Sequence, residues 1–367
     1  MKLFGTKRNA AHYAKKRGKG RKIFLILFTL MLVLGGGVYA LMTAFIRPPV
    51  PPDFRQPPRQ PPSTVISPVP PEQEEPVKAD RAFTVLIAGQ DNVGTIGLTD
   101  TLMLATVDSA NRSINVVSIP RDTLVDVNWV GRKINSVFAM TGSVHRLVDE
   151  VERVVGFRPD FYVTVDLQAF TTLVDVLEGV WFDVPVRMRY DDPYDSPPLH
   201  IHLDPGYQLL TGNQAGQLVR FRQNNDGSGY GDFGRIQTQQ AFLHAVAAEL
   251  LQIRNVTRIG ELAGIFIDHV DTDMPIGSLI WLATQLMDMD SDNINFLLMP
   301  VEEGIWLGGV SYVALLLEEW LEMVNAYLNP TPWPVTEENV RVFTRVNGTI
   351  QLVGEGLSFS GTEEEES

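Results

Sequence analysis

Between residues 83 and 188 the chain alternates short β-branched runs with longer stretches of helical period. Short apolar runs bounded by turn residues predict strands, and apolar positions three and four apart predict helices. The predicted strands are FTVLIAG (83–89), TLMLATVD (101–108), SINVVSIP (113–120), YVTVD (162–166) and VWFDVPVRM (180–188). The predicted helices of this part are 144–155 and 168–179.

After residue 200 the pattern becomes mostly helical. The predicted helices are QLLTGNQAGQLVRF (208–221), RIQTQQAFLHAVAAELLQIR (235–254), PIGSLIWLATQLMDM (275–289) and SYVALLLEEWLEMVNAYL (311–328). NFLLMP (295–300) predicts another strand, and VRVFTRVNGTIQLVG (340–354) predicts a small β appendage. Strands that alternate with helices favour one α/β (α+β) domain over residues 81–328, with a central mixed β-sheet flanked by helices.

One long apolar run precedes this domain. Residues 23–46 carry no charge, and a helix of 24 residues spans about 36 Å, enough to cross a hydrocarbon core of roughly 30 Å. Residues 1–22 hold nine Lys and Arg and no acidic residue. The positive-inside rule therefore predicts a single-pass cell-membrane protein with a cytoplasmic N-terminus and an extracellular domain. A cleaved signal peptide is the alternative, but the run is longer than a usual signal sequence and no A-x-A site follows it.

Two segments of biased composition flank the domain. Residues 47–80 contain 12 of the 24 prolines, a composition that favours an extended spacer holding the domain off the membrane. Residues 329–367 are predicted as a C-terminal extension that ends in the solvated acidic tail GTEEEES.

Charge and missing motifs exclude several classes of function. The net charge is −14, and since residues 1–22 carry +9, the remaining residues sum to −23. Such a domain repels nucleic acid, so no nucleic-acid partner is expected. There is no cysteine, and G-x-S-x-G, H-E-x-x-H and P-loop motifs are absent. GYGDFG (229–234) matches G-x-G-x-x-G, but it lies between two predicted helices and not after a strand, so it does not indicate a dinucleotide site.

Acidic residues stand where the first predicted strand ends and the second begins. Asp91 lies in AGQDN (88–92) and Asp100 in TDT (99–101). Two carboxylates in such a crevice suit Mg²⁺, especially if phosphate oxygens complete its coordination. The alternative is that each aspartate only stabilises a turn or caps a helix. His200 and His202 alternate near three aspartates, which indicates either a metal site or, as the simpler interpretation, an exposed polar loop.

Arginines gather in two places of this acidic domain. Arg121, in SIPRDT (118–123), follows the third predicted strand and points towards the usual ligand crevice of an α/β sheet, with an ion pair to Asp122 as the alternative. RFRQNNDGSGYGDFGR (220–235) places three more arginines around a glycine-rich turn. Guanidinium forks bind phosphate oxygens bidentately, and a helix N-terminus favours an anion. Together with the carboxylates, these arginines predict a pyrophosphate site.

The chain resembles the LytR-CpsA-Psr family through motifs that occur in the family's order. The motifs are LIAGQDN, LTDTLMLATVD, NVVSIPRDTLVDV, KINSVFAMTG, DFYVTVDLQAFTTLVDVLEGV, LDPGYQLLTGNQA, VRFR and GDFGRIQTQQ. They span about residues 83–250 and, less clearly, the chain up to residue 328. The family has the same predicted topology, with a basic cytoplasmic tail, one membrane helix and an external catalytic domain.

Members of that family transfer an anionic glycopolymer from an undecaprenyl pyrophosphate carrier to peptidoglycan, as a phosphodiester to the C6 hydroxyl of N-acetylmuramic acid. The resemblance implies that Asp91 and Asp100 hold Mg²⁺ (or Mn²⁺) on the pyrophosphate. It implies catalytic roles for Arg121, Arg220, Asp232 and Arg235, with the arginines on phosphate oxygens and the aspartate orienting them or assisting proton transfer. The substrate-binding residues that it implies are Asp122, Lys133, Asn135, Arg222, Gln239 and Gln240.

The chain departs from the family pattern at two positions. Thr238 stands where the family usually has arginine, which puts one phosphate or polymer contact in doubt, and Thr99 replaces a serine. The family fold also encloses an apolar channel for the lipid tail, and AFLHAVAAELL (241–251) fits that channel and plain core equally well. Two other functions remain open: a polyprenyl pyrophosphate hydrolase that uses water at the same site, and a non-catalytic polymer-binding or regulatory membrane protein. The charge of the domain argues against transcription regulation.

Overall fold

The structure is a computed structural model that describes residues 46–51, 82–90, 99–194, 198–250, 270–287 and 293–356. The chain divides into two compact units, and we call unit 1 the one formed by Met1–Pro49 with Pro275–Leu282 and unit 2 the remainder. The predicted cytoplasmic tail, most of the predicted membrane helix and proline-rich spacer, and the acidic tail lie outside the described residues. Among the helices that are described, none has the length and apolar character needed to cross a membrane.

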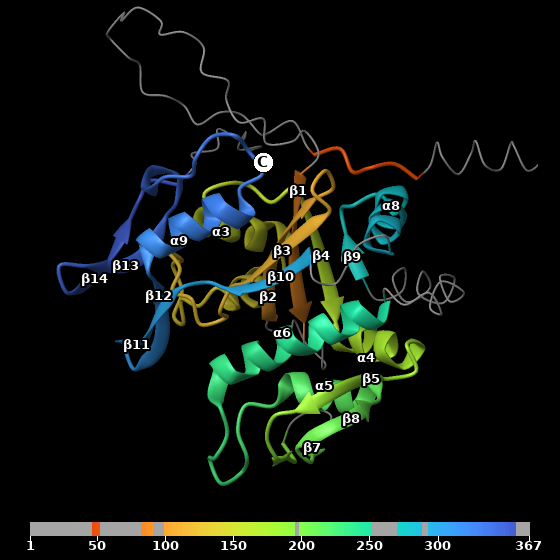
Figure 1. Cartoon of the computed structure of the whole chain (residues 1–367). Helices are drawn as coiled ribbons and strands as arrows, with labels where there is room; N and C mark the ends of the chain where they lie inside the picture. The colour runs from red at the N-terminus through yellow and green to blue at the C-terminus, as the bar shows by residue number, and fades with distance from the viewer. Residues whose placement is uncertain are drawn as a thin grey trace, which may run out of the picture. The chain divides into compact units, whose positions relative to one another are not determined.

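A six-stranded mixed sheet forms the centre of unit 2 (Figure 1). Its order is β10 (Ile294–Leu298), β3 (Ser113–Ser118), β2 (Thr99–Asp108), β1 (Ala82–Gln90), β4 (Phe161–Asp166) and β9 (Val270–Thr272). The first three strands of the chain are antiparallel neighbours, whereas β4 runs parallel to β1 and β10 parallel to β3. The predicted central mixed sheet is therefore confirmed.

Helix α3 (Val144–Val155) has the predicted bounds because local signals mark both of its ends. The Ser143 hydroxyl accepts a hydrogen bond from the Arg146 backbone N–H, and Gly156 ends the helix with a φ of 82°. A Cβ at Gly156 would lie 2.4 Å from Val335, so this close approach requires glycine. The apolar stripe of α3 packs on the sheet in one core that includes Leu86 and Val117.

The other helices described in unit 2 are mostly short. They are α2 (Ser136–Thr141), α4 (Leu167–Val176), α5 (Gly212–Arg220), α6 (Gly231–Leu250), α9 (Leu317–Met323), the π-helix η3 (Val324–Leu328) and the 3₁₀-helix η4 (Glu337–Asn339). Helix α8 (Ile276–Met287) begins in unit 1. Helix α6 begins four residues before the predicted start, so GDFG forms its first turn.

Three predicted elements differ from the structure. The strand predicted over 180–188 is divided at Pro185 into β5 (Val180–Val184) and the start of β6 (Met188–Asp192), because proline cannot donate to a strand ladder. The helix predicted over 208–221 starts as strand β8 (Gly206–Leu210), which pairs with β5. Thr211 then opens α5 with a capping box. Strand β7 (Leu199–Leu203) pairs with β6.

The third difference is at residues 311–328, where a single helix was predicted. The first part forms strand β12 (Val310–Leu315), which pairs with β11 (Val301–Leu307), and only the rest is helical. Strand β12 also meets β13 (Val342–Val346), which pairs with β14 (Thr349–Val353). The predicted β appendage is thus part of a four-stranded sheet, and the predicted boundary at residue 328 falls inside unit 2.

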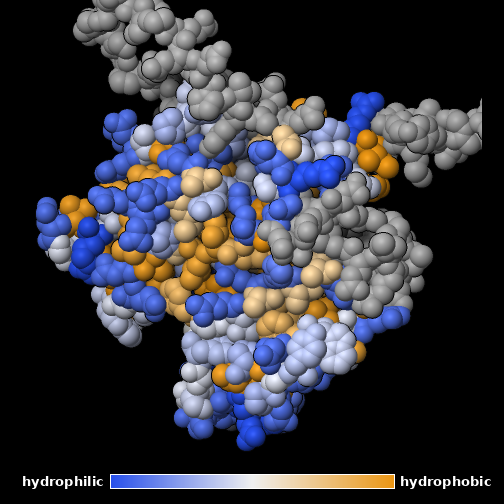
Figure 2. Space-filling model, in the orientation of Figure 1, coloured by the Kyte–Doolittle hydropathy of each residue, from blue (hydrophilic) through white to orange (hydrophobic). Residues whose placement is uncertain are grey.

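Strand β10 lies at the edge of the six-stranded sheet, where helix α6 contacts it. Phe296, Leu297 and Leu298 are partly buried there, and the Phe296 ring centroid lies 6.2 Å from that of His244 on α6. Figure 2 shows hydrophobic residues near the centre of the displayed face, in the region where β10 and α6 lie in Figure 1. This part of the surface is therefore less polar than the rest of the displayed face.

Helix α3 carries a buried carboxylate that makes stability depend on pH. The Glu152 side chain is 4% exposed, and its Oε2 accepts a hydrogen bond of 3.0 Å from Arg158 Nη1. Burial raises the pKa of Glu152 from 4.5 to about 7, against the opposing effect of Arg158. The folded protein therefore binds a proton here more tightly than the unfolded chain does.

Glu152→Gln is expected to remove part of the pH dependence of stability. The stabilisation from the protonated carboxyl is fully present below pH 4.5 and is lost as the pH rises to about 7. Since the amide stays neutral, the variant should be more stable than the wild type at pH 8, by on the order of 2–3 kcal/mol, and equally stable at pH 4. Thermal unfolding at both pH values measures this. The exposed control Glu319→Gln should show no such change, and parallel curves for the wild type and Glu152→Gln would contradict the prediction.

Candidate functional site

Asp100 and Arg121 meet at the start of β2. Gly89 pairs with Thr101 and Gln90 with Thr99, so Asp100 is the extra residue of a β-bulge. Its Oδ1 accepts a hydrogen bond of 2.6 Å from Nη1 of Arg121, which follows the end of β3. The Arg121 side chain is only 13% exposed. The structure therefore brings together one predicted metal ligand, on β2, and one predicted phosphate clamp, in the segment after β3.

Arg235 joins this pair from helix α6. Its side chain is buried, and its Nη2 donates a hydrogen bond of 3.5 Å to the Asp100 carbonyl oxygen. Gln239 lies four residues after Arg235 on the same face of α6, and it donates a hydrogen bond of 2.7 Å to the Val219 carbonyl oxygen. Val219 directly precedes Arg220, the last residue of α5. The first turns of α6 thus lie between the start of β2 and the end of α5.

Gln240 fixes α6 to the sheet. Its side-chain nitrogen donates to Ser118 Oγ at 2.8 Å and to the Leu297 carbonyl oxygen at 2.7 Å, on neighbouring strands β3 and β10. Gln239 and Gln240, predicted to bind substrate, therefore both bond to protein groups that position α6. Thr238, which stands where the family usually has arginine, is buried.

Lys133 and Asn135 lie beside Arg121. Lys133 Nζ is 2.8 Å from Asp122 Oδ1, whereas Arg121 Nε is 3.8 Å from the same oxygen. Asn135 is buried, and its backbone bonds to Thr99 Oγ1 at 3.2 Å and to the Arg121 carbonyl at 3.3 Å. Arg121 therefore makes its shorter ion pair with Asp100 and not with Asp122, which is paired with Lys133.

The glycine-rich segment folds mainly against β6. Asn224 Oδ1 accepts from the Arg189 backbone at 2.6 Å, and Asn225 Oδ1 accepts from the Asp191 backbone at 2.7 Å. A Cβ at Gly229, whose φ is 145°, would lie 2.6 Å from the Gln223 Cα. Here glycine lets the loop fold on itself.

The remaining candidate residues differ in their surroundings. Arg220 is partly buried and Arg222 is exposed, with the buried Phe221 between them. Asp91 lies outside the described residues, and of Asp232 only the backbone is described, in the first turn of α6.

His200 and His202 belong to the polar hairpin β6–β7. His200 Nδ1 lies 2.5 Å from one carboxylate oxygen of Asp191, and His202 Nε2 lies 3.0 Å from the other. These hydrogen bonds lower the pKa of Asp191. The His200 and His202 side chains are 64% and 55% exposed, which agrees with the interpretation of an exposed polar segment.

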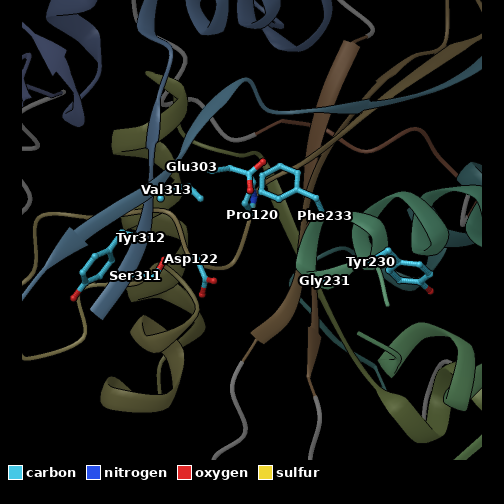
Figure 3. Close-up of a pocket in the computed structure, with 10 residues that line it drawn as sticks. Pro120, Asp122, Tyr230, Gly231, Phe233, Glu303, Ser311, Tyr312 and Val313 are labelled. Atoms are coloured by element: carbon cyan, nitrogen blue, oxygen red, sulfur yellow. The ribbon is translucent and has the colours of Figure 1, made fainter. Parts of the chain in front are cut away.

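A cleft with a cavity volume of about 260 Å³ opens beside Arg121 (Figure 3). Among the residues that line it, those with polar or aromatic side chains are Asp122, Tyr230, Phe233, Glu303, Ser311 and Tyr312, of which Tyr230 turns its ring away from the others (Figure 3). Figure 3 shows that they come from the segment after β3, the start of α6 and the β11–β12 hairpin. Of these six, the sequence singled out only Asp122.

The hairpin residues reach the cleft through contacts that have no local sequence signal. Val313 on β12 donates its backbone N–H to the Asp122 carbonyl at 3.0 Å and accepts from the Leu124 N–H at 2.9 Å. This bridge joins segments that are distant in the chain. The sequence could have indicated this pairing in one way only, if residues 311–328 had been interpreted as a strand followed by a helix.

Comparison with known proteins finds relatives over most of the folded part of the chain. "Regulatory protein MsrR" of Staphylococcus aureus (strain COL) is 28% identical over 231 residues, which is 62% of this chain and 67% of that protein. "Polyisoprenyl-teichoic acid--peptidoglycan teichoic acid transferase TagU" of Halalkalibacterium halodurans is 30% identical over 249 residues, which is 66% of this chain and 77% of that protein.

A solved structure and a family model complete the comparison. The crystal structure of Bacillus subtilis TagV has a TM-score of 0.51 and 28% identity, and the match covers 63% of this chain and 89% of that chain. The LytR_cpsA_psr family model matches residues 59–328, well over half of the chain. With its motifs in family order and its mixed sheet, the chain therefore belongs to the LytR-CpsA-Psr family.

Proposed function

We propose that this protein transfers an anionic glycopolymer, such as a teichoic acid, from an undecaprenyl pyrophosphate carrier to the C6 hydroxyl of N-acetylmuramic acid in peptidoglycan. The observation that carries the proposal is the meeting of Asp100, Arg121 and Arg235, from three separate segments, beside an open cleft. Two buried or nearly buried guanidinium groups in an acidic protein favour a pyrophosphate ligand. The name of the TagU relative, a teichoic acid transferase, supports the same reaction.

The proposed reaction is a substitution at phosphorus. The C6 hydroxyl oxygen of the acceptor forms a bond to the phosphorus that carries the polymer. The bond from this phosphorus to the bridging oxygen of the pyrophosphate breaks, and undecaprenyl phosphate leaves with the electron pair. The hydroxyl proton passes to a base or to solvent. Arg121 and Arg235 would neutralise charge on the phosphate oxygens as the leaving group departs.

We further propose Mg²⁺ (or Mn²⁺) as the cofactor, held by Asp91 and Asp100. Asp100 fits this role because its carboxylate is partly exposed and lies at a bulge beside Arg121. Gln90, which precedes Asp91 in the chain, pairs with Thr99, which precedes Asp100. Carboxylate and phosphate oxygens are the ligands that Mg²⁺ prefers, and the bound ion would supply positive charge to the pyrophosphate.

The proposed topology is a single membrane pass with an extracellular catalytic domain, as the basic residues before the apolar run indicate. The apolar tail of the carrier would contact hydrophobic surface, for which the region around β10 and α6 is one candidate. A reporter fused after Ser367 that works only outside the cytoplasm should be active. Activity of a cytoplasm-only reporter at the same position would contradict the topology.

Product analysis tests the reaction itself. The purified full-length protein should join a synthetic lipid-linked teichoic acid to peptidoglycan in the presence of Mg²⁺ and release undecaprenyl phosphate. Release of the phosphorylated polymer at the same rate without peptidoglycan would favour the hydrolase. Absence of any turnover with both substrates, together with intact polymer binding, would favour a binding or regulatory protein.

A further inference from the structure

The cleft beside Arg121 contains side chains that the proposed phosphoryl transfer leaves without a role. Glu303 and Ser311 belong to the β11–β12 hairpin, and Phe233 belongs to the first turn of α6. Asp122 lines the same cleft and follows Arg121 directly, so the cleft adjoins the proposed phosphate site.

A bulge in β11 places Glu303 at the cleft. Glu302 pairs with Ala314 and Ile305 with Tyr312, so two residues of β11 stand opposite the single residue between them on β12. Such a bulge redirects side chains, and Gly304, with a φ of 74°, permits the turn in the backbone. The neighbouring Glu302 is held by Arg345 through hydrogen bonds of 2.7–3.0 Å, which fixes the strand. Glu303 is thus an exposed carboxylate on a strand that the neighbouring Glu302–Arg345 ion pair holds in place.

The charges of the cleft decide which part of the substrates fits there. Asp122 is paired with Lys133, whereas Glu303 makes no hydrogen bond or ion pair with another described residue. An uncompensated carboxylate repels phosphate groups, so the cleft disfavours the polyanionic donor polymer. It disfavours the apolar carrier tail as well, because burial of carboxylates against hydrocarbon is costly. A neutral molecule rich in hydroxyl donors meets neither penalty.

An exposed tryptophan extends the same face. Trp306 is 69% exposed and pairs with Ser311 across the hairpin, so both side chains point to the side of the sheet that borders the cleft. Sugar rings carry an apolar face of C–H groups, which packs favourably against the electron-rich face of an aromatic ring. The Glu303 carboxylate and the Ser311 hydroxyl, which line the cleft, can then accept hydrogen bonds from the sugar hydroxyls.

We infer that this cleft is the subsite for a neutral sugar residue of the acceptor glycan, an inference that rests on the proposed function. Glu303 and Ser311 bind the sugar hydroxyls, and Trp306 packs against the next part of the glycan strand. The volume of about 260 Å³ is below the roughly 300–1,000 Å³ of sites for drug-sized ligands, which suits one sugar ring and not a polymer segment. The bound donor polymer therefore extends from the phosphate site in a direction away from this cleft.

The test uses the full-length protein with two probes. Glu303→Gln and Trp306→Ala should each weaken binding of an N-acetylglucosamine tetramer about tenfold in isothermal titration, which corresponds to 1.4 kcal/mol. Each should also raise the KM for peptide-free glycan strands by a similar factor, while the KM for the lipid-linked donor changes less than twofold. Both side chains are exposed, so the variants should fold normally.

Trp181→Ala serves as the matched control, because Trp181 is also exposed but stacks on Tyr207 in the β5–β8 sheet. Equal loss of tetramer binding in this control, or unchanged binding and KM in both cleft variants, would overturn the inference. The same measurements test the proposed function separately. If the wild-type protein shows no transfer activity but its tetramer binding still depends on Glu303, the transferase function is refuted and the sugar site remains. Transfer with an unchanged glycan KM in both variants would refute the sugar site alone.

Discussion

Arg235→Lys is expected to lower kcat by at least roughly 10³-fold, by analogy with arginines that neutralise charge in phosphoryl transfer. Arg235 is only 3% exposed, and its side chain contacts the carbonyl oxygen of Asp100, the proposed metal ligand. Lysine keeps the charge but loses the planar fork that binds two phosphate oxygens, so some donor binding should remain while turnover is lost. Single-turnover transfer assays, with donor binding measured in parallel, check both effects.

Arg146→Lys on α3 is the matched control, because its side chain is 61% exposed on a different helix and its variant should turn over normally. Arg220→Lys should lower kcat to a similar degree as Arg235→Lys. Arg220 directly follows Val219, whose carbonyl bonds to Gln239 one turn after Arg235 on α6. Arg222 is exposed on the other side of the buried Phe221, so its lysine variant should lose less activity. Turnover within about threefold of the wild type for both Arg220→Lys and Arg235→Lys would mean that these arginines are structural.

Asp100→Ala is expected to abolish Mg²⁺-dependent transfer, with a loss of roughly 10²–10³-fold or more at saturating metal, because metal charge stabilises a phosphoryl transition state by several kcal/mol. The variant also removes the 2.6 Å ion pair with Arg121. Since that pair is partly exposed, we expect a loss in the free energy of unfolding of only about 1–2 kcal/mol. Mn²⁺ binding, followed by electron paramagnetic resonance, should be lost together with activity.

Asp108→Ala at the other end of β2 is the control for this stability loss. Asp108 accepts hydrogen bonds from the backbones of Ala110 and Asn111 in a turn, so its removal should lower stability to a similar degree without lowering transfer. If Asp100→Ala kept Mn²⁺ binding and transfer at limiting metal, Asp100 would be only a bulge residue that positions Arg121.

Much of the fold could be predicted from local patterns. Helix α3 has the predicted ends because Ser143 and Gly156 mark them, and strands β1, β2 and β3 of the central sheet were recognisable as β-branched runs. Strand β9 of the same sheet was not predicted. The predictions over 208–221 and 311–328 went wrong because pairing with another strand decides the structure there. The run SYVALL (311–316) is apolar at most positions and has no clear period, and pairing with β11 makes it a strand.

The candidate site shows the same division. Asp100, Arg121 and Arg235 were candidates because of their residue types and places in family motifs, and the structure brings these three together. The cleft residues Glu303 and Ser311 could not be found in this way. They reach Asp122 only through the contact of β12 with the segment after β3, and no local preference of either segment encodes that contact.

From the sequence alone follow the family, most strands and helices, and the collection of arginines and carboxylates suited to a pyrophosphate. Only the tertiary structure decided that Arg121 pairs with Asp100 while Asp122 pairs with Lys133, that the glycine-rich loop folds against β6, and that the β11–β12 hairpin borders the site. Periodicity, capping and turn preferences act between residues a few positions apart, so they can be read along the chain. Ion pairs and strand pairings between distant segments depend on how the whole chain packs, so they become visible only in the folded protein.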